Sequence, residues 1–387
     1  MSWQVVDGVS TNLSSDSVKF ELEDLLQFEN TEDGWLYKIE RIDNEHFVVG
    51  YLANQTMYLR IFKYDGELTV LDTYSSDKYI MAINFTMCLL DASRLMVSYA
   101  FYEGSYKQTA YTFEINSDYE ISIIDSLQHG ARTSGGYDAL ITMDSTHCVL
   151  STNDFSDKTS RVKSFSVDSS YNITLIDTYV NGDNGVSTGM TKVDDTHFML
   201  ANETTDERGV IRVFEIDGSY NISLTSTLTH DETATYYFAL LKMPDDKYIL
   251  VYTSGSSPTN DSLIKVFGMD NYVLTQESSV VNEKDNGYNY SIVQVDDSHF
   301  IVEYVIGPSG AATKAYELNT NNTVTLIDTL NVGGDYGYII KLRPSIYAMA
   351  YLDADTYFES YINMIEFISD EDVWNKQTKP TTIWEVQ

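Results

Sequence analysis

The residue pairing best suited to chemistry is an aspartate followed three residues later by a histidine. It stands in VDDTHF at 193–198 and, nearly unchanged, in VDDSHF at 295–300. A carboxylate and an imidazole this close can ligate Zn²⁺ or exchange a proton as an acid–base pair. The spacing occurs at Asp43 and His46, Asp144 and His147, Asp194 and His197, and Asp296 and His299. A reaction centre needs one such pair, so the recurrence directs attention to the elements that carry it.

Each pair belongs to a thirteen-residue segment that is found seven times at intervals of about 50 residues. The copies begin at Ile39, Met87, Leu140, Met190, Leu240, Ile292 and Ile339. Each reads as an apolar strand, a short polar turn and a second strand with alternating apolar residues, which predicts a β-hairpin. The aspartate and histidine fall in the turn, and three copies carry Arg94, Lys247 or Ile346 instead of the histidine. Because turns of successive units cannot converge on one ion, we predict that the pair shapes the backbone.

Two further strands follow each hairpin. The third carries Phe62, Phe113, Phe165, Phe214, Phe267 or Tyr316, with Ile365 in the last unit. The fourth alternates strictly, as in ELTVLDT at 67–73, but only six copies follow their hairpins. KFELEDL at 19–25 fits the same pattern and precedes the first hairpin. The N-terminus therefore supplies the strand that the last unit lacks, which would close a ring and leave no unpaired edge between its ends.

Seven four-stranded units predict an all-β fold: a seven-bladed β-propeller with four antiparallel strands per blade, its last blade closed by the N-terminal strand. The chain resembles propellers with such a velcro closure, as in the WD-repeat family, although the GH and WD dipeptides are absent. The repeat, roughly VDDTHFVLAY, is similar to repeats in structural proteins of tailed phages and environmental viruses. We place the propeller at 18–370, between extensions at 1–17 and 371–387.

The composition restricts the partners. Among 387 residues there are 58 acids and 24 bases, a formal net charge of −34, so nucleic acid and anionic membrane surfaces would be repelled. No run of 18 apolar residues predicts membrane insertion, and the first residues lack the pattern of a secretory signal. Cys88 and Cys148 stand in apolar segments, which predicts buried free thiols.

Further motifs for chemistry are missing from the sequence. It has no phosphate-binding loop and no G-x-S-x-G elbow, and its acids are too numerous to mark a glycosidase pair. His129 and His230 stand between units and are expected to be solvated loop residues. Acid-rich loops at 180–187, 282–289 and 331–337 leave Ca²⁺ open as a cofactor, although turn chemistry accounts for the same residues. We therefore predict no catalytic residue, no metal site and no other cofactor.

Recognition is expected on the face opposite the Asp–His turns. The loops between second and third strands differ in every unit, and variable loops on a regular scaffold commonly carry binding residues. Aromatic residues recur where the chain enters each innermost strand, near the channel mouth: Tyr37, Tyr79, Tyr137, Tyr237, Tyr290 and Tyr338. Aromatic faces bordered by Asp, Asn and Gly suit a sugar or a peptide. Packing of these rings between blades is the alternative.

These observations predict a non-enzymatic binding or structural module on a virion or another extracellular surface. It would dock on other structural protein chains through its extensions, which hold Trp3, Trp374 and Trp384. Its loops would face a partner or a surface glycan. The alternative is an extracellular glycan-active lyase or hydrolase, which requires acids and tyrosines within reach of one sugar at the channel mouth. A cytoplasmic interaction scaffold is a third possibility.

Overall fold

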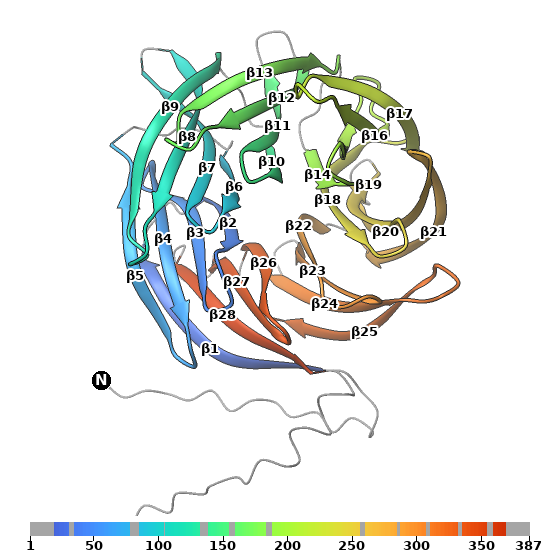
Figure 1. The fold of residues 1–387 in the computed structure, drawn as a ribbon. Coiled ribbons are helices and arrows are strands. Elements are labelled where there is room, and N and C mark those ends of the chain that lie inside the picture. The colour runs from blue at the N-terminus through green and yellow to red at the C-terminus, as the bar shows by residue number, and fades with distance from the viewer. Residues whose placement is uncertain are drawn as a thin grey trace, which may run out of the picture.

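In the computed structural model the chain forms a ring of β-sheets (Figure 1). The structure describes residues 19–30, 35–77, 85–103, 105–131, 138–154, 159–182, 188–255, 260–284, 287–306, 310–331, 335–353 and 359–368. Within these ranges there is no helix, and hence none of membrane-spanning length. The predicted extensions at 1–17 and 371–387 lie outside the described residues.

The strands form seven four-stranded antiparallel sheets, numbered here as blades in chain order. Blade 1 is β2 (Trp35–Arg41), β3 (His46–Ala53), β4 (Thr56–Tyr64) and β5 (Leu68–Ser75). Blade 2 is β6 (Phe85–Asp91), β7 (Arg94–Tyr102), β8 (Tyr106–Ile115) and β9 (Ile121–Ala131). Blade 3 is β10 (Ala139–Asp144), β11 (His147–Asp154), β12 (Thr159–Val167) and β13 (Ile173–Val180). Blade 4 is β14 (Thr188–Lys192), β15 (His197–Glu203), β16 (Gly209–Ile216) and β17 (Ile222–Asp231).

The remaining blades continue the same order. Blade 5 is β18 (Thr235–Met243), β19 (Lys247–Ser254), β20 (Asp261–Asp270) and β21 (Val273–Glu283). Blade 6 is β22 (Gly287–Gln294), β23 (His299–Ile306), β24 (Ala311–Leu318) and β25 (Val324–Asn331). Blade 7 is β26 (Asp335–Arg343), β27 (Ile346–Asp353), β28 (Glu359–Ile368) and β1 (Lys19–Asn30). The predicted seven-bladed architecture is confirmed.

The ring closes through strands from opposite ends of the propeller segment. The first strands of the blades lie nearest the centre, and each contacts the first strands of both neighbouring blades (Figure 1). At the rim, β1 lies along β28, with pairing from Lys19 opposite Ile368 to Asn30 opposite Glu359. The N-terminal strand therefore completes the last blade, as its sequence pattern predicts.

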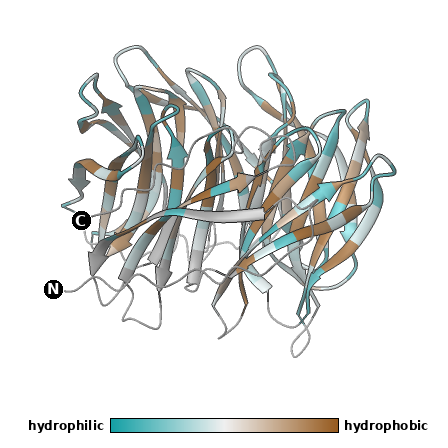
Figure 2. Ribbon diagram, turned by 90° about the horizontal axis from the view of Figure 1, so that it is seen from below, coloured by the Kyte–Doolittle hydropathy of each residue, from teal (hydrophilic) through white to brown (hydrophobic). Residues whose placement is uncertain are grey.

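The hydrophobic core is divided into seven clusters, each shared by two neighbouring blades. Hydrophobic residues alternate with hydrophilic ones along many strands (Figure 2). The third-strand aromatics Phe62, Phe113, Phe165, Phe214 and Phe267 are each fully buried in a different cluster. Burying one phenylalanine stabilises the fold by about 2–3 kcal/mol. Packing between blades 1 and 2 is tight at Gly50, where an added Cβ would lie 2.3 Å from the Phe85 ring.

Two expectations about single residues have different outcomes. Cys88 and Cys148 are free and buried, as predicted. His129 and His230 are not solvated loop residues, because β9 and β17 extend beyond the alternating motif and include them. His230 is only 7% exposed, and His129 is partly buried. Burial, together with the neighbouring lysine Lys163 or Lys265, lowers the pKa of each imidazole to about 3.

Candidate functional site

The Asp–His pairs hold neighbouring blades together. Asp194 Oδ1 accepts hydrogen bonds from the Thr196 backbone N–H at 2.8 Å and from Thr196 Oγ1 at 3.0 Å, and it lies 3.1 Å from His197 Nδ1. From blade 5, the Tyr272 hydroxyl donates to Asp194 Oδ2 at 3.0 Å. The Tyr272 ring stacks on the His197 imidazole with centroids 3.6 Å apart. Both carboxylate oxygens, the Nδ1 atom and the imidazole face of the pair are therefore engaged in shaping the turn or in contacting the next blade.

The same contact recurs at two other blade boundaries. We call the three sets turn latches: Asp43, His46 and Tyr119; Asp144, His147 and Tyr220; Asp194, His197 and Tyr272. In the first two, the imidazole and phenol stack at 3.6 and 3.4 Å. The three tyrosines adopt positive φ between 61° and 62°, a conformation that is unfavourable without such support. In these three of the four Asp–His pairs, the contacts are those expected of a structural role.

Hydrogen bonding keeps the latch carboxylates ionised. Partial burial alone would raise the pKa of Asp194, but hydrogen bonds from Thr196, His197 and Tyr272 outweigh it and lower the value to about 2. Asp43 is lowered to about 2 in the same way, against the effect of its own partial burial. The latches therefore act as charged hydrogen-bond acceptors rather than as proton donors near neutral pH.

Other contacts strengthen the same face of the ring. Lys192 Nζ donates to the Met143 carbonyl of the preceding blade at 2.6 Å, and Lys242 Nζ donates to the Val193 carbonyl at 2.5 Å. In the fourth strands, Asp72 Oδ2 accepts from the Ile121 backbone N–H of the next blade at 2.7 Å. These repeated polar side chains are therefore committed to joining blades.

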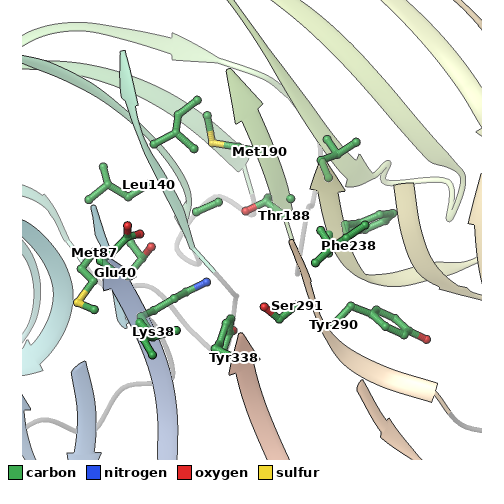
Figure 3. A pocket seen from close by; sticks show the side chains of 18 of the residues that line it. Lys38, Glu40, Met87, Leu140, Thr188, Met190, Phe238, Tyr290, Ser291 and Tyr338 are labelled. Atoms are coloured by element: carbon green, nitrogen blue, oxygen red, sulfur yellow. The ribbon is translucent and has the colours of Figure 1, made fainter. Parts of the chain in front are cut away.

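The innermost strands surround a cavity of about 260 Å³ on the axis of the ring (Figure 3). Its described lining is mostly small or apolar, with hydroxyls from Thr86, Thr188 and Ser291. Among these described residues, Lys38 is the one cation and Glu40 the one carboxylate. The Lys38 ammonium points into the channel in Figure 3. This cavity is the candidate functional site.

Lys38, Glu40 and Tyr338 give the site its chemical character. Lys38 Nζ lies 4.3 Å from the centroid of the Tyr338 ring, a cation–π contact between blades 1 and 7. Burial raises the pKa of Glu40 to about 7, and the Lys38 ammonium opposes this rise. Lys38 is the middle residue of β2, and Tyr338 is the fourth residue of β26. The channel lining therefore combines a cation, an aromatic ring and an acid from two neighbouring innermost strands.

The structure places three of the six tyrosines predicted to line the channel mouth. Tyr338 lines the cavity. The Tyr237 ring is partly buried at 5.8 Å from Tyr288 of the next blade. Tyr290 also contributes to the cavity lining, but its side chain points away from the channel in Figure 3, is only 6% exposed, and has its hydroxyl 3.0 Å from Thr253 Oγ1. Tyr290 thus follows the packing alternative. Tyr79, Tyr137 and the side chain of Tyr37 lie outside the described residues.

Lys38 and Glu40 were not among the residues predicted from the sequence. The residue before each thirteen-residue segment is Lys38, Thr86, Ala139, Gly189, Ala239, Ser291 or Tyr338. Five of these are small, so the two large members, Lys38 and Tyr338, interrupt the repeat where side chains face the channel. Comparing the copies position by position would therefore have singled out the pair that meets in the structure.

The structure offers no support for a metal centre within the part of the chain that it describes. No group of three or more His, Cys, Asp or Glu side chains is placed to hold an ion there. The acid-rich loops at 180–187, 282–289 and 331–337 each contain residues outside the described set. Ca²⁺ binding by these loops stays a prediction.

No protein-family model matches the sequence, and no curated protein sequence does either. Solved structures are similar in fold. A putative 6-phosphogluconolactonase from Bacteroides fragilis has a TM-score of 0.54 and 13% identity, covering 81% of this chain and 94% of that one. The periplasmic gluconolactonase of Pseudomonas aeruginosa has a TM-score of 0.54 and 11% identity, covering 80% and 92%. A chain of the COPII outer coat vertex on membranes has a TM-score of 0.58 and 10% identity, covering 87% and 85%. At these identities the likeness shows the propeller fold alone.

Proposed function

We propose that the chain is a non-enzymatic binding module that takes a surface glycan at the loop-side mouth of its channel. The observation that carries the proposal is the contact of Lys38 with Tyr338 in the channel, where the repeat is interrupted. An aromatic ring offers a surface for the apolar face of a sugar, and the ammonium and nearby hydroxyls supply hydrogen bonds for its hydroxyl groups. The opposite face carries the turn latches, whose polar groups bond to the next blade.

A glycan-active enzyme is less well supported by the same cavity. Glycoside hydrolysis ordinarily uses two carboxyl groups that flank the bond to be cleaved. The described lining of the channel contains one, Glu40. The two lactonases share only the fold with this chain, so their activity is no argument for catalysis here.

We propose further that the module belongs to a virion or another extracellular surface and docks there through the segments at 1–17 and 371–387. The support is the resemblance of the repeat to repeats in viral structural proteins, the acidic composition and the tryptophans of these segments. Removing both segments should release the propeller from isolated particles without changing its melting temperature. A truncated chain that remains particle-bound would contradict docking through these segments.

Glycan binding is tested with the purified full chain on a glycan array, followed by titration of the glycans that bind. Lys38→Ala and Tyr338→Ala should each weaken binding at least tenfold, a loss of about 1.4 kcal/mol. Asp195→Ala is the matched control, because its side chain is 97% exposed on the opposite face. Binding that survives both channel substitutions would disprove this site. Release of shortened glycan during the same incubation would instead support the enzyme.

A further inference from the structure

At two blade boundaries a buried lysine of the chain lies beside a tyrosine ring and an acid of the preceding blade. Lys314 on β24 is 8% exposed, and its Nζ donates to the Asn282 carbonyl at 2.7 Å. Its ammonium also lies 3.1 Å from Glu283 Oε2 and 5.2 Å from the centroid of the Tyr304 ring. The Tyr304 hydroxyl donates to Glu283 Oε2 at 3.0 Å. The Lys314 ammonium therefore contacts a carbonyl, a tyrosine ring and a carboxylate.

The preceding boundary repeats this arrangement. Lys265 on β20 is 7% exposed and donates from Nζ to the His230 carbonyl. Its Nζ lies 5.4 Å from the centroid of the Tyr252 ring. The Tyr252 hydroxyl donates to Asp231 Oδ2 at 2.7 Å. In blades 5 and 6 alike, a third-strand ammonium thus fills the space beside a second-strand tyrosine and an acid from the preceding blade.

Blade 2 has the tyrosine and the acid without the lysine. By strand register, Tyr99 matches Tyr252 and Tyr304, and Tyr111 stands where Lys265 and Lys314 stand. The preceding blade supplies the acid, Asp77. It stands as many residues after the β-bulge of β5 as Asp231 and Glu283 stand after the β-bulges of β17 and β21. Glu29 of β1 stands at the same offset at the boundary of blades 7 and 1, where Arg60 lies 5.5 Å from the centroid of the Tyr51 ring. Of the four boundaries with this acid, the one between blades 1 and 2 therefore lacks the third-strand cation.

A cavity of about 450 Å³ lies at this boundary, lined by Tyr74, Asp77, Tyr99, Phe101, Lys107 and Tyr111 among others. The Tyr99 and Tyr111 rings stack with centroids 4.6 Å apart, and their hydroxyls hydrogen-bond to each other. Lys107 does not replace the missing cation, because its ammonium pairs with Glu103 Oε2 at 2.8 Å. The cavity is of the size of small-ligand sites and combines aromatic surface with an acid.

We propose that this cavity between blades 1 and 2 binds an external alkylammonium group. The chain itself shows the recognition chemistry, since the same framework holds Lys265 and Lys314 at two other boundaries. Aromatic rings attract ammonium ions through their π faces, and Asp77 supplies the opposite charge. The ammonium comes either from a lysine of a partner protein or from a free aliphatic amine. This proposal is independent of glycan binding in the channel, which other residues line.

The test titrates the full chain with butylammonium, with 1,5-diaminopentane and with Nα-acetyl-lysine methylamide, using 1-butanol as the uncharged control. Binding is followed by NMR shifts and by calorimetry. We expect the amines to bind, with Kd on the order of 1 mM for butylammonium, and butanol not to bind. Tighter binding of the lysine derivative would assign the cavity to a protein partner, and tighter binding of the diamine would assign it to a free amine. Equal binding of butanol and butylammonium would overturn the proposal.

Two substitutions locate the binding. Asp77→Asn should weaken butylammonium binding at least tenfold, whereas Asp118→Asn, an exposed turn residue of blade 2, should leave it unchanged. Tyr111→Lys should abolish binding and raise the melting temperature, because it supplies the ammonium that blades 5 and 6 already have. If Tyr111→Lys does not fold, Asp77→Asn still decides, and unchanged affinity in Asp77→Asn would disprove the site.

Discussion

The two faces of the propeller use their polar residues differently. On the face that carries the hairpin turns, aspartates, histidines and tyrosines form the same contact at three blade boundaries. Towards the loop side, equivalent positions differ between blades, as with Lys38 and Tyr338 at the channel and Tyr111 at the boundary of blades 1 and 2. Residue types that recur at equivalent positions therefore hold the ring together. A residue that differs from its equivalents in the other blades is a candidate for binding.

The contrast has a physical basis. Neighbouring blades must be joined at every boundary, so the same residue types can serve at several of them, as the three turn latches do. A ligand is bound once, and the residues that contact it need not occur in the other blades. An acid–histidine pair that looks catalytic in isolation therefore loses that interpretation when its copies are compared.

We expect the largest change in stability from the first aspartate of VDDTHF, Asp194, and almost none from the second, Asp195. Asp194→Ala removes the acceptor of hydrogen bonds from Thr196, His197 and Tyr272, so the free energy of unfolding should fall by about 3 kcal/mol. Asp195→Ala removes only an exposed ion pair with Lys192 and should change it by less than about 0.5 kcal/mol. Urea unfolding of both variants measures the difference. Equal losses would mean that the latch does not stabilise the ring.

A smaller loss of stability is expected when only the hydrogen bond between blades 4 and 5 is removed. Tyr272→Phe keeps the stacking on His197 but removes the hydroxyl that donates to Asp194, so about 1.5 kcal/mol should be lost. Tyr171→Phe is the matched control, since Tyr171 occupies the same turn position at φ 66° in blade 3. In the preceding blade 2, Arg94 rather than a tyrosine bonds the corresponding aspartate, Asp91. Its unfolding free energy should stay within about 0.3 kcal/mol of the wild-type value. The two variants would behave alike if the hydroxyl contributes nothing.

The latch also predicts a pH dependence. The pKa of Asp194 is about 2 in the folded chain and 3.8 as its ordinary value, so its contribution is present above pH 4 and is lost as the pH falls from about 4 to about 2. The side chain is 39% exposed, and solvent screening reduces the contribution to about 1 kcal/mol. Asp194→Asn should therefore flatten the decline in stability in this window. An unchanged slope in acid titrations of unfolding would contradict the assignment.

The fold could be predicted from the sequence because the same strand pattern recurs along the chain. Seven copies of the hairpin, and the KFELEDL strand at 19–25, indicate the blade number and the closure. The alternating pattern did not reveal where the fourth strands end, which is why His230 was expected in a loop although it lies in β17. Nor could it show that the rings of Tyr119, Tyr220 and Tyr272 reach back to the preceding blade, since this depends on the angle between sheets.

The binding candidates were harder to predict for the same reason. Tyr338 was found because it is aromatic, but its partner Lys38 becomes apparent only when the copies are compared position by position. Tyr290 shares the aromatic character of Tyr338 and packs between blades, because it stands one residue out of phase with the channel-facing position. Residue type alone does not distinguish these two tyrosines, whereas the direction of the side chain does.

The smallest effect on stability is expected in the channel. Lys38→Ala removes a partly exposed side chain with one cation–π contact to Tyr338, so the unfolding free energy should change by about 0.5 kcal/mol. The same substitution should abolish most glycan binding, whereas Asp194→Ala should leave binding intact in the fraction that is folded. Urea unfolding and glycan titration of both variants complete the comparison. A loss of more than about 2 kcal/mol in Lys38→Ala would show that the channel residues also hold the ring, because only lost packing or an unpaired buried charge reaches that size.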